Sequence, residues 1–315
     1  ESSAASDVYK RQIVPFLAPD IPPNFESVAS SVGDLNDVGH AVGAEHFEEE
    51  LPDGSFQTVR WALHLDMASW TYTRLQAPNG SYYPGCVNNL NQIVGERTDG
   101  GRAPVFWNGL DAAPVDLPLL PEDTEGSALG INDAGIIVGF SSHDASSDKG
   151  VVWRVFVDEN GDVSFVDGPV PLPPLDGDTR TAGLDLTELI DGSFQVSGNS
   201  RGEAGTPIGP AEADVWTIGV DPDGTLATPP APVALGTLVL YDPTNSYGNA
   251  IIVLGDVCGS SDGMPYVAPA GQTAQALPVT RNTYRGQARD INDAGEIVGY
   301  LTILLKGGSH ITEDA

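Results

Sequence analysis

The sequence predicts an all-β protein built as a β-propeller of about six four-stranded blades. The 315 residues include 37 glycines and 25 prolines, and no window of fifteen residues keeps a clean helical period. A short unit, clearest at residues 128–140, recurs in variant form along the chain and ends each time in a glycine. The closing glycines are 52, 44, 59, 61 and 40 residues apart. Periods of this size are typical of propeller blades and not of short solenoid coils.

Each copy of the unit predicts a β-hairpin. In the third copy, Asn132-Asp133-Ala134-Gly135 separates two apolar runs. Asn or Asp opens a type I turn, and Gly135 can take the left-handed conformation that closes it. The repeated Asn and Asp side chains are therefore interpreted as caps of their own turns and not as metal ligands. The fourth and fifth copies are degenerate. The closing glycines are Gly43, Gly95, Gly139, Gly198, Gly259 and Gly299.

A third strand is predicted after each hairpin, and it usually carries a tryptophan. A large apolar side chain there would fill the space between adjacent sheets, and its indole N–H would need an acceptor. A fourth run then leads to a Leu-Pro pair, so that each repeat supplies the four strands of a blade. The third-strand segments are 59–61, 105–107, 151–153 and 214–216, with 265–267 as the substitute in the fifth repeat.

The first residues resemble something other than protein-coding sequence. Residues 2–12 resemble, residue for residue, the translation of a transposon-end adapter used to prepare DNA libraries. This resemblance implies a metagenomic fragment whose native sequence before Ile13 is missing, so residues 1–12 are set apart as a non-native tail.

Residues 13–315 are predicted to form one propeller-like repeat domain. Residues 13–27 are interpreted as a fourth strand that either closes the last blade or is a relic of a lost blade. Because a sixth tryptophan strand does not appear before Ala315, the propeller is expected to be truncated at one or both ends. The repeats are expected at about 28–80, 81–125, 126–180, 181–244, 245–284 and 285–315.

The repeat also resembles a known family. The pattern small-x-Ile-Asn-Asp-Ala-Gly-x-Ile-Val-Gly, followed by a polar loop, an aliphatic pair and Trp, is similar to the HAF-type extracellular repeat of secreted bacterial proteins. The resemblance covers residues 28–315 and is strongest in the third and sixth copies. It implies a propeller-like domain located outside the cell or at the cell surface, and it brings no catalytic residues.

The charge balance excludes some partners. With 14 basic and 44 acidic side chains, the net charge of −30 repels phosphate backbones, so no nucleic-acid partner is expected. A solvated, aggregation-resistant surface explains this acidity better than cation binding does. No run of 18 apolar residues is present, so no membrane span is predicted. Cys86 and Cys258 are expected to be free and mostly buried thiols.

Three groups of residues are candidate functional sites, and each also has a structural explanation. Gly259-Ser260-Ser261-Asp262-Gly263 matches the nucleophile-elbow pattern, but no helix is predicted after it, so no catalytic residue is assigned. Asp158, Asn160 and Asp162 space their oxygens as a calcium loop does, although a hairpin turn at Asn160-Gly161 explains them better. Trp70 and Tyr72 alternate on a predicted strand and form a candidate aromatic binding platform, for which packing against the next blade is the favoured alternative.

The function predicted from the sequence is a secreted, repeat-built binding or structural module. Its ligand is an unidentified extracellular glycan or protein, and no cofactor other than calcium is considered. Two alternatives stay open. One is a propeller enzyme, a hydrolase or lyase, that acts on polysaccharide through paired carboxylates at the channel mouth. The other is a passive spacer or surface component of a larger extracellular protein.

Overall fold

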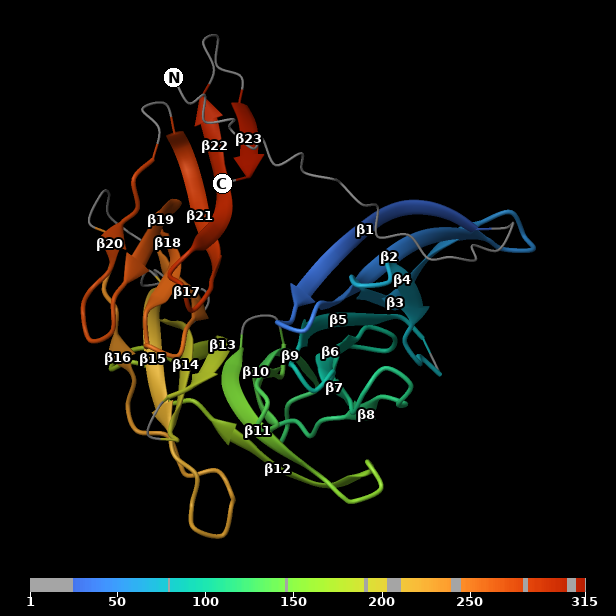
Figure 1. The fold of residues 1–315 in the computed structure, drawn as a ribbon, viewed down its shortest axis with the longest axis horizontal. Coiled ribbons are helices and arrows are strands. Elements are labelled where there is room, and N and C mark those ends of the chain that lie inside the picture. Colours follow the sequence, from blue (N-terminus) through green and yellow to red (C-terminus); the bar gives the residue numbers. More distant parts are fainter. Residues whose placement is uncertain are drawn as a thin grey trace, which may run out of the picture.

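The computed structural model describes residues 25–78, 80–144, 147–189, 192–202, 211–238, 245–279, 283–304 and 310–314. In these residues the regular structure is entirely β, and it is arranged as six antiparallel sheets (Figure 1). Five sheets have four strands and the sixth has three. The predicted all-β, propeller-like fold is confirmed, with the difference that the described part of the last blade is three-stranded.

The six sheets, here called blades 1 to 6, follow one another along the chain. Blade 1 contains β1 (Phe25–Leu35), β2 (His40–Glu50), β3 (Phe56–Asp66) and β4 (Thr71–Arg74). Blade 2 contains β5 (Tyr82–Val87), β6 (Ile93–Arg97), β7 (Ala103–Trp107) and β8 (Val115–Asp116). Blade 3 contains β9 (Glu125–Ile131), β10 (Ile136–Ser142), β11 (Lys149–Val157) and β12 (Val163–Pro171).

Blade 4 contains β13 (Arg180–Glu188), β14 (Phe194–Arg201), β15 (Glu212–Ile218) and β16 (Val233–Ala234). Blade 5 contains β17 (Ser246–Ile251), β18 (Val257–Ser261), β19 (Met264–Ala268) and β20 (Gln275–Ala276). Blade 6 contains β21 (Thr283–Ile291), β22 (Ile297–Leu304) and β23 (His310–Asp314). Within each blade the strands pair in chain order, so the first strand lies at one edge.

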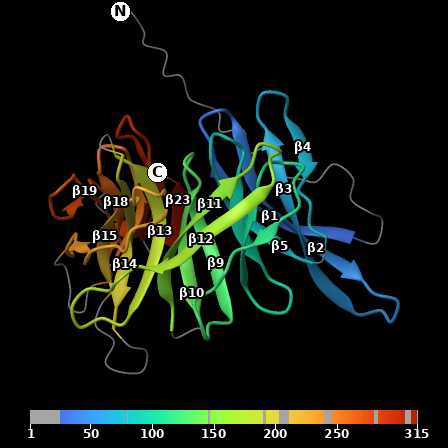
Figure 2. The same cartoon turned by 90° about the horizontal axis from the view of Figure 1, so that it is seen from below.

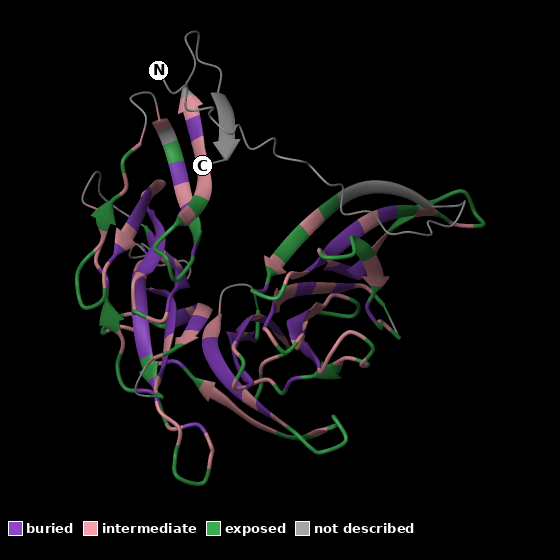
Figure 3. Ribbon diagram, in the orientation of Figure 1, coloured by how far each residue is buried: buried purple, intermediate pink, exposed green. Residues whose placement is uncertain are grey.

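Each blade packs against the next one in the chain. The first strand of every blade from 2 to 6 contacts the strands of the preceding blade, and an apolar cluster fills each of these five interfaces. In the described part of the chain, blade 6 makes no comparable contact with blade 1 (Figure 1). Figure 2 shows blade 3 between blades 1 and 2 on one side and blades 4 to 6 on the other. The buried residues lie mainly on the strands, and the loops are exposed (Figure 3).

The Asn-Asp-Ala-Gly turns are capped as predicted. In blade 3, Asn132 Oδ1 accepts the backbone N–H groups of Ala134 and Ile136 at 3.1 and 3.0 Å. Gly135 has a φ of 72°, which is the left-handed conformation expected of the glycine that closes the turn. Asn292 in blade 6 accepts two equivalent bonds at 3.1 and 2.9 Å. The interpretation as turn caps is confirmed for the Asn side chains. It is wrong for the Asp side chains, because Asp133 and Asp293 accept backbone N–H groups of other blades, from Asn89 at 2.8 Å and from Val253 at 3.3 Å.

The closing glycine of each repeat, which is distinct from the turn glycine, lies in the second strand of the hairpin. At this position the backbone of the first strand comes too close to leave room for a side chain. A Cβ atom at Gly139 would lie 2.0 Å from the carbonyl oxygen of Ser127 on the neighbouring strand, well inside van der Waals contact. The other five closing glycines face the same situation. Their added Cβ atoms would lie 1.9–2.1 Å from a carbonyl oxygen of the first strand, at Gly43, Gly95, Gly198, Gly259 and Gly299.

Three of the tryptophans fill the spaces between blades, as predicted. Trp107, Trp153 and Trp216 are fully buried. The indole N–H of each donates to a carbonyl oxygen at the end of the preceding blade's fourth run. The acceptors are Gln76 O at 2.9 Å, Pro118 O at 2.7 Å and Pro173 O at 2.8 Å, in the same order. The recurring Trp therefore joins consecutive blades by both packing and a hydrogen bond.

The strand register corrects the alignment of the first and fifth repeats. In blades 2 to 4 the Trp pairs with the residue two positions before the closing glycine. In blade 1 that position is opposite Leu65, whereas Trp61 pairs with Glu45 on the other side of Gly43. In blade 5 the position is taken by Ala268, and Tyr266 lies two residues earlier. Trp61 and Tyr266 are thus not counterparts of the other tryptophans.

Candidate functional site

Every blade has a β-bulge at the same place in its first strand. One residue there is skipped in the pairing with the second strand, directly opposite the region of the closing glycine. A bulge leaves its residue outside the hydrogen-bond ladder and changes the direction of the side chain. The six bulge residues are Gly33, Gly85, Leu129, Leu184, Asn249 and Arg289.

These bulges meet around a cavity of about 570 Å³, which we call the central channel. All six bulge residues line it, together with the residue that follows the bulge in five of the blades. The lining residues come from the first strands of all six blades, which are far apart in the sequence, so the channel forms only when the six blades are assembled. The residues that follow the bulges and line the channel are Asp34, Cys86, Asp185, Ala250 and Asp290, and Gln287 completes the lining.

Three carboxylates occupy equivalent positions in the channel wall. Asp34 Oδ2 accepts the backbone N–H of Val87 at 3.0 Å and the thiol of Cys86, also at 3.0 Å, both in the next blade. Asp185 Oδ2 accepts the N–H of Ile251, again in the next blade, at 2.9 Å.

The third carboxylate, Asp290, accepts the N–H of its own neighbour, Ile291, at 2.8 Å. These bonds orient the carboxylates around the channel.

The channel environment raises the pKa values of Asp185, Asp290 and Cys86. Burial, with added repulsion from Asp290 and Asp34, raises the pKa of Asp185 to about 7. Burial and the charge of Asp34 also raise the pKa of Asp290. The pKa of the Cys86 thiol is raised by burial and by Asp34, so this thiol stays protonated at neutral pH. Perturbed carboxyl groups gathered in one cavity are typical of functional sites.

Arg289 adds a positive charge to this acidic channel. Its side chain is exposed, and its guanidinium lies over the Tyr300 ring, 5.3 Å from the ring centroid. Asn249 and Gln287 supply amide groups, and Asn249 Nδ2 donates to Ala288 O at 2.6 Å. The channel wall therefore offers carboxylates, amides and one guanidinium to a ligand.

One end of the channel is formed by the hairpin turns. A hollow of about 360 Å³ lies there among the turn residues of blades 1 to 5. Asn36 Nδ2 donates to Asn88 O at 2.8 Å, and Asn88 Nδ2 donates to Asn132 O at 2.9 Å. The repeated Asn thus ties its turn to the next blade, a role that the sequence interpretation missed. Within the described residues Asn132 Nδ2 has no acceptor, and the degenerate fourth repeat has Thr187 in the place of the next Asn.

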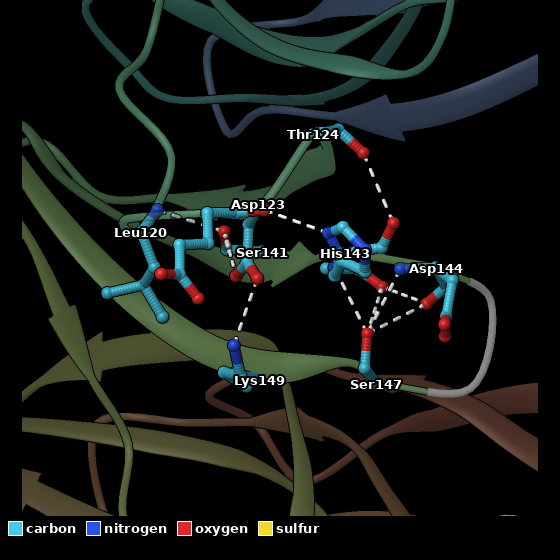
Figure 4. A network of polar contacts seen from close by, with 10 residues as sticks. Leu120, Asp123, Thr124, Ser141, His143, Asp144, Ser147 and Lys149 are labelled. Carbon is cyan, nitrogen blue, oxygen red and sulfur yellow. Dashed lines mark hydrogen bonds and ion pairs between the residues drawn. The ribbon is translucent and has the colours of Figure 1, made fainter.

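At the opposite end of blade 3, a polar network fastens the loop before β9 (Figure 4). The Asp123 carboxylate is 1% exposed and accepts from Lys149 Nζ at 2.9 Å and from Ser141 Oγ at 2.8 Å. Ser141 Oγ also accepts the N–H of Leu120 at 3.0 Å, and His143 Nδ1 donates to Glu122 O at 2.9 Å. Because these groups bind one another and the backbone, the network is structural.

The candidate calcium residues lie in the hairpin turn between β11 and β12. Asp158 Oδ1 accepts the N–H groups of Asn160 at 2.9 Å and Asp162 at 3.0 Å, and these bonds lower the pKa of Asp158. Gly161 completes the turn with a φ of 86°. Nowhere among the described residues do three or more His, Cys, Asp or Glu side chains form a group suited to a metal ion. Calcium binding at Asp158, Asn160 and Asp162 stays a prediction.

The two aromatics of the candidate platform do not share a strand face. Trp70 lies in the turn before β4, with a φ of 55° and 50% exposure. Tyr72 lies in β4 and is half-buried against the apolar cluster of blade 1. A platform at this site would therefore depend on Trp70, with Tyr72 supporting it from the sheet.

The nucleophile-elbow pattern predicted from the sequence lies at a turn between two strands. Ser260 and Ser261 end β18, and the chain turns at Asp262-Gly263 directly into β19. This strand-to-strand turn differs from the strand-to-helix turn of a nucleophile elbow. Cys86 and Cys258 are free, as predicted; Cys258 is buried and Cys86 half-buried.

Comparisons with known proteins identify no family. No family model matches the chain, and no curated protein matches it. Among solved structures, the chain is similar to that of YjhT, with a TM-score of 0.40 and 10% identity over 91% of this chain and 84% of the other. It is also similar to a glycosyl hydrolase from Bacteroides ovatus, with a TM-score of 0.31 and 10% identity over 79% and 82%. Likeness at this level carries no argument about ligand or activity.

No helix capable of spanning a membrane occurs among the described residues.

Proposed function

We propose that the chain is a binding module of an extracellular or cell-surface protein, and that its ligand binds in the central channel. The observation that carries this proposal is the ring of bulges, which brings Asp34, Asp185 and Asp290 into one cavity of about 570 Å³. Carboxylates held in a cavity accept strong hydrogen bonds from a ligand. The raised pKa values of Asp185 and Asp290 support a role beyond stability, because stability alone would favour apolar residues at these two positions.

The chemistry of the channel favours a ligand rich in hydroxyl groups, such as the end of a glycan. Hydroxyls donate to carboxylates and accept from amides and guanidinium groups. Since the pKa of Asp185 is about 7, this group can donate or accept a hydrogen bond at neutral pH. The resemblance to HAF-type repeats and the net charge of −30 support an extracellular location for such a ligand.

A glycan array followed by calorimetry tests the proposal. The intact chain should bind at least one glycan class, and Asp185→Asn and Asp290→Asn should each weaken that binding by about tenfold, close to 1.4 kcal/mol. Asp158→Asn is the matched control, because Asp158 caps a turn outside the channel and its replacement should leave affinity unchanged. If glycan binding persisted in both channel variants, the ligand would lie elsewhere, with the Trp70 surface as the next candidate.

A second candidate function, polysaccharide hydrolysis, is favoured by one specific observation. Burial, with added repulsion from Asp290 and Asp34, raises the pKa of Asp185 to about 7, and a carboxyl group with a raised pKa beside other carboxyl groups has the character of a general acid. Release of reducing ends from a bound polysaccharide, lost in Asp185→Asn, would support this function. Binding without release would favour the binding module. If no glycan bound at all, the passive spacer would be favoured.

A further inference from the structure

Two histidines share a hydrogen bond on the face of blade 1 that packs against blade 2. His40 Nδ1 lies 2.8 Å from His64 Nε2, and the two ring centroids are 4.9 Å apart. His64 pairs with Val42, and alternate residues of a strand share a face, so His40, Val42 and His64 point the same way. Val42 belongs to the apolar cluster between blades 1 and 2. The two histidines therefore belong to this interface, which we call the first seam.

Other blades have apolar side chains at these positions. In the strand register, His64 corresponds to Phe106 in blade 2 and to Val152 in blade 3, and both are fully buried. His40 corresponds to Ile136 in blade 3, which is also fully buried. Apolar side chains are thus sufficient for packing at a seam, and blade 1 has a hydrogen-bonded, titratable pair instead.

The first seam holds His64 in its neutral form. His64 is 2% exposed, and its Nδ1 has no partner among the described residues. A neutral ring with its proton on Nε2 donates to His40 and leaves Nδ1 as a bare nitrogen, which costs less than a buried N–H without an acceptor. A second proton would have to occupy Nδ1 and would place a charge in the seam. Burial, followed by the charge of His40, lowers the pKa of His64 to about 4, while Asp66 acts in the opposite direction.

The groups around the pair do not offset a positive charge on His64. The nearest is Asp66, opposite His40 at the end of β3, and its carboxylate is held by bonds within its own turn. On β4, the uncharged Thr73 pairs with His64. Among the described residues, blade 2 contributes one titratable side chain to the apolar cluster, Tyr82, which stays neutral in acid because burial raises its pKa. The next titratable side chains along the same face of β2 and β3 are His46 and Arg60.

We propose that the His40–His64 pair makes the packing of blade 1 on blade 2 sensitive to acid, so that protonation of the pair opens the first seam. An open seam exposes both rings to water, which supplies an acceptor for every N–H of a protonated imidazole. In the open state His64 regains its ordinary pKa of 6.5, whereas in the closed state the pKa is about 4. Because the closed state has the lower pKa, the open fraction rises as the pH falls from 6.5 towards 4.

Opening of the first seam would change the wall of the central channel. Blade 1 supplies Gly33 and Asp34 to that wall. Asp34 accepts hydrogen bonds from Cys86 and Val87 of blade 2 across the same seam. A ligand in the channel would therefore be held less tightly in acid. This last consequence rests on the proposed function, whereas the opening of the seam does not.

Three buried tryptophans provide matched probes of three successive seams. The indole N–H of Trp107 donates to Gln76 O in the first seam, and Trp153 and Trp216 make equivalent bonds at the next two. Hydrogen exchange of these indole N–H groups, followed by NMR and expressed relative to free indole at the same pH, measures the opening of each seam. From about pH 7.5 to about pH 5, the protection of Trp107 should fall at least about tenfold more than that of the other two.

A double variant tests whether the histidines cause this response. His40→Ile combined with His64→Val gives blade 1 the apolar pair of blade 3, so Trp107 should then respond to acid as Trp153 does. His143→Gln changes an exposed histidine outside the seam and should keep the native response. An equal response of the three seams in the native protein, or a native response in the double variant, would overturn the proposal.

A titration of the native protein keeps the test decisive even if the double variant fails to fold. Nitrogen NMR of the imidazole rings should show His64 as the neutral Nε2–H tautomer at neutral pH. As long as the seam is closed, His64 should not take up a proton near its ordinary pKa of 6.5. Titration of His64 near that value, with the Trp107 indole still protected, would overturn the proposal.

Discussion

Asp185 of blade 4 accepts the backbone N–H of Ile251 of blade 5 at 2.9 Å, across the seam between two blades. The same carboxylate faces the central channel, where burial and two neighbouring acids raise its pKa to about 7. The Asp185 side chain thus links two blades and also places a titratable group in the cavity. The stability of the ring should therefore depend on pH through this residue.

Asp185→Asn should reduce the loss of stability between pH 4 and pH 7. Because the pKa in the folded state lies well above the ordinary value of an aspartate, the folded state holds the proton more tightly, and the free energy of unfolding falls as pH rises through this window. A rise in pKa of this size corresponds to about 4 kcal/mol, and partial exposure to the channel reduces this to about 1–2 kcal/mol. Thermal melts from pH 4 to pH 8 measure the effect, and parallel curves for both proteins would contradict it.

Asp214→Val should stabilise the protein at alkaline pH. Asp214 is fully buried in β15, and burial raises its pKa to about 7 although its Oδ2 accepts a hydrogen bond from Ser200 Oγ. Its Oδ1 has no partner among the described residues. Val105 and Val151 hold the same register position in blades 2 and 3 and are fully buried.

We expect Asp214→Val to gain about 2 kcal/mol at pH 8 and much less at pH 4, where the acid is neutral. Urea titrations at both pH values check this, with the exposed Asp176→Val as the control. A loss of stability at pH 8 would show that the buried carboxylate is satisfied.

Gly139→Ala should destabilise blade 3 severely, by about 2–4 kcal/mol, because the new Cβ would lie 2.0 Å from Ser127 O and the paired strands would have to separate. Gly85→Ala is the matched control. Its Cβ would meet Ala128 O at 3.7 Å, an ordinary contact. Denaturant unfolding of the two variants should therefore give very different midpoints. Similar midpoints would mean that the strands can move apart at little cost, and that the close approach does not require glycine.

Trp153→Ala should cost about 3–5 kcal/mol, because it leaves a cavity between blades 2 and 3. Trp153→Phe keeps most of the packing but loses the bond to Pro118 O, so a smaller cost of about 1–2 kcal/mol is expected. Trp70→Ala removes an exposed tryptophan and should leave the melting temperature within about one degree. A large effect at Trp70 would contradict its assignment to an exposed turn.

The hairpins and the tryptophan positions of blades 2 to 4 could be predicted because they depend on local chemistry. Turns such as Asn132–Gly135 carry their cap and their left-handed glycine within four residues. Trp61 was aligned wrongly with the tryptophans of blades 2 to 4. The strands β2 and β3 are each 11 residues long, and in this long hairpin Trp61 lies four residues before Leu65, which takes the position of the other tryptophans.

The channel acids were missed for a different reason. Asp34 and Asp290 both stand two residues before the Asn-Asp pair, and Asp185 stands in the same column of a degenerate copy. This shared position in the aligned repeats was the only indication of the channel acids in the sequence. A bulge breaks the alternation of faces along a strand, so the residues around it could not be assigned to the channel from the pattern alone. The bonds between successive turns were missed because they depend on how the blades are placed in space.

The bulges also separate two kinds of position in the repeat, one variable and one constant among the six blades. A bulge residue is skipped in the hydrogen-bond pairing of the first and second strands, so its identity is not restricted by that pairing. Glycine, leucine, asparagine and arginine occur at this position in different blades. The closing glycine opposite stays invariant across all six repeats of the same chain. A single substitution at one bulge should therefore change the channel wall in one blade and leave the strand pairing of that blade intact.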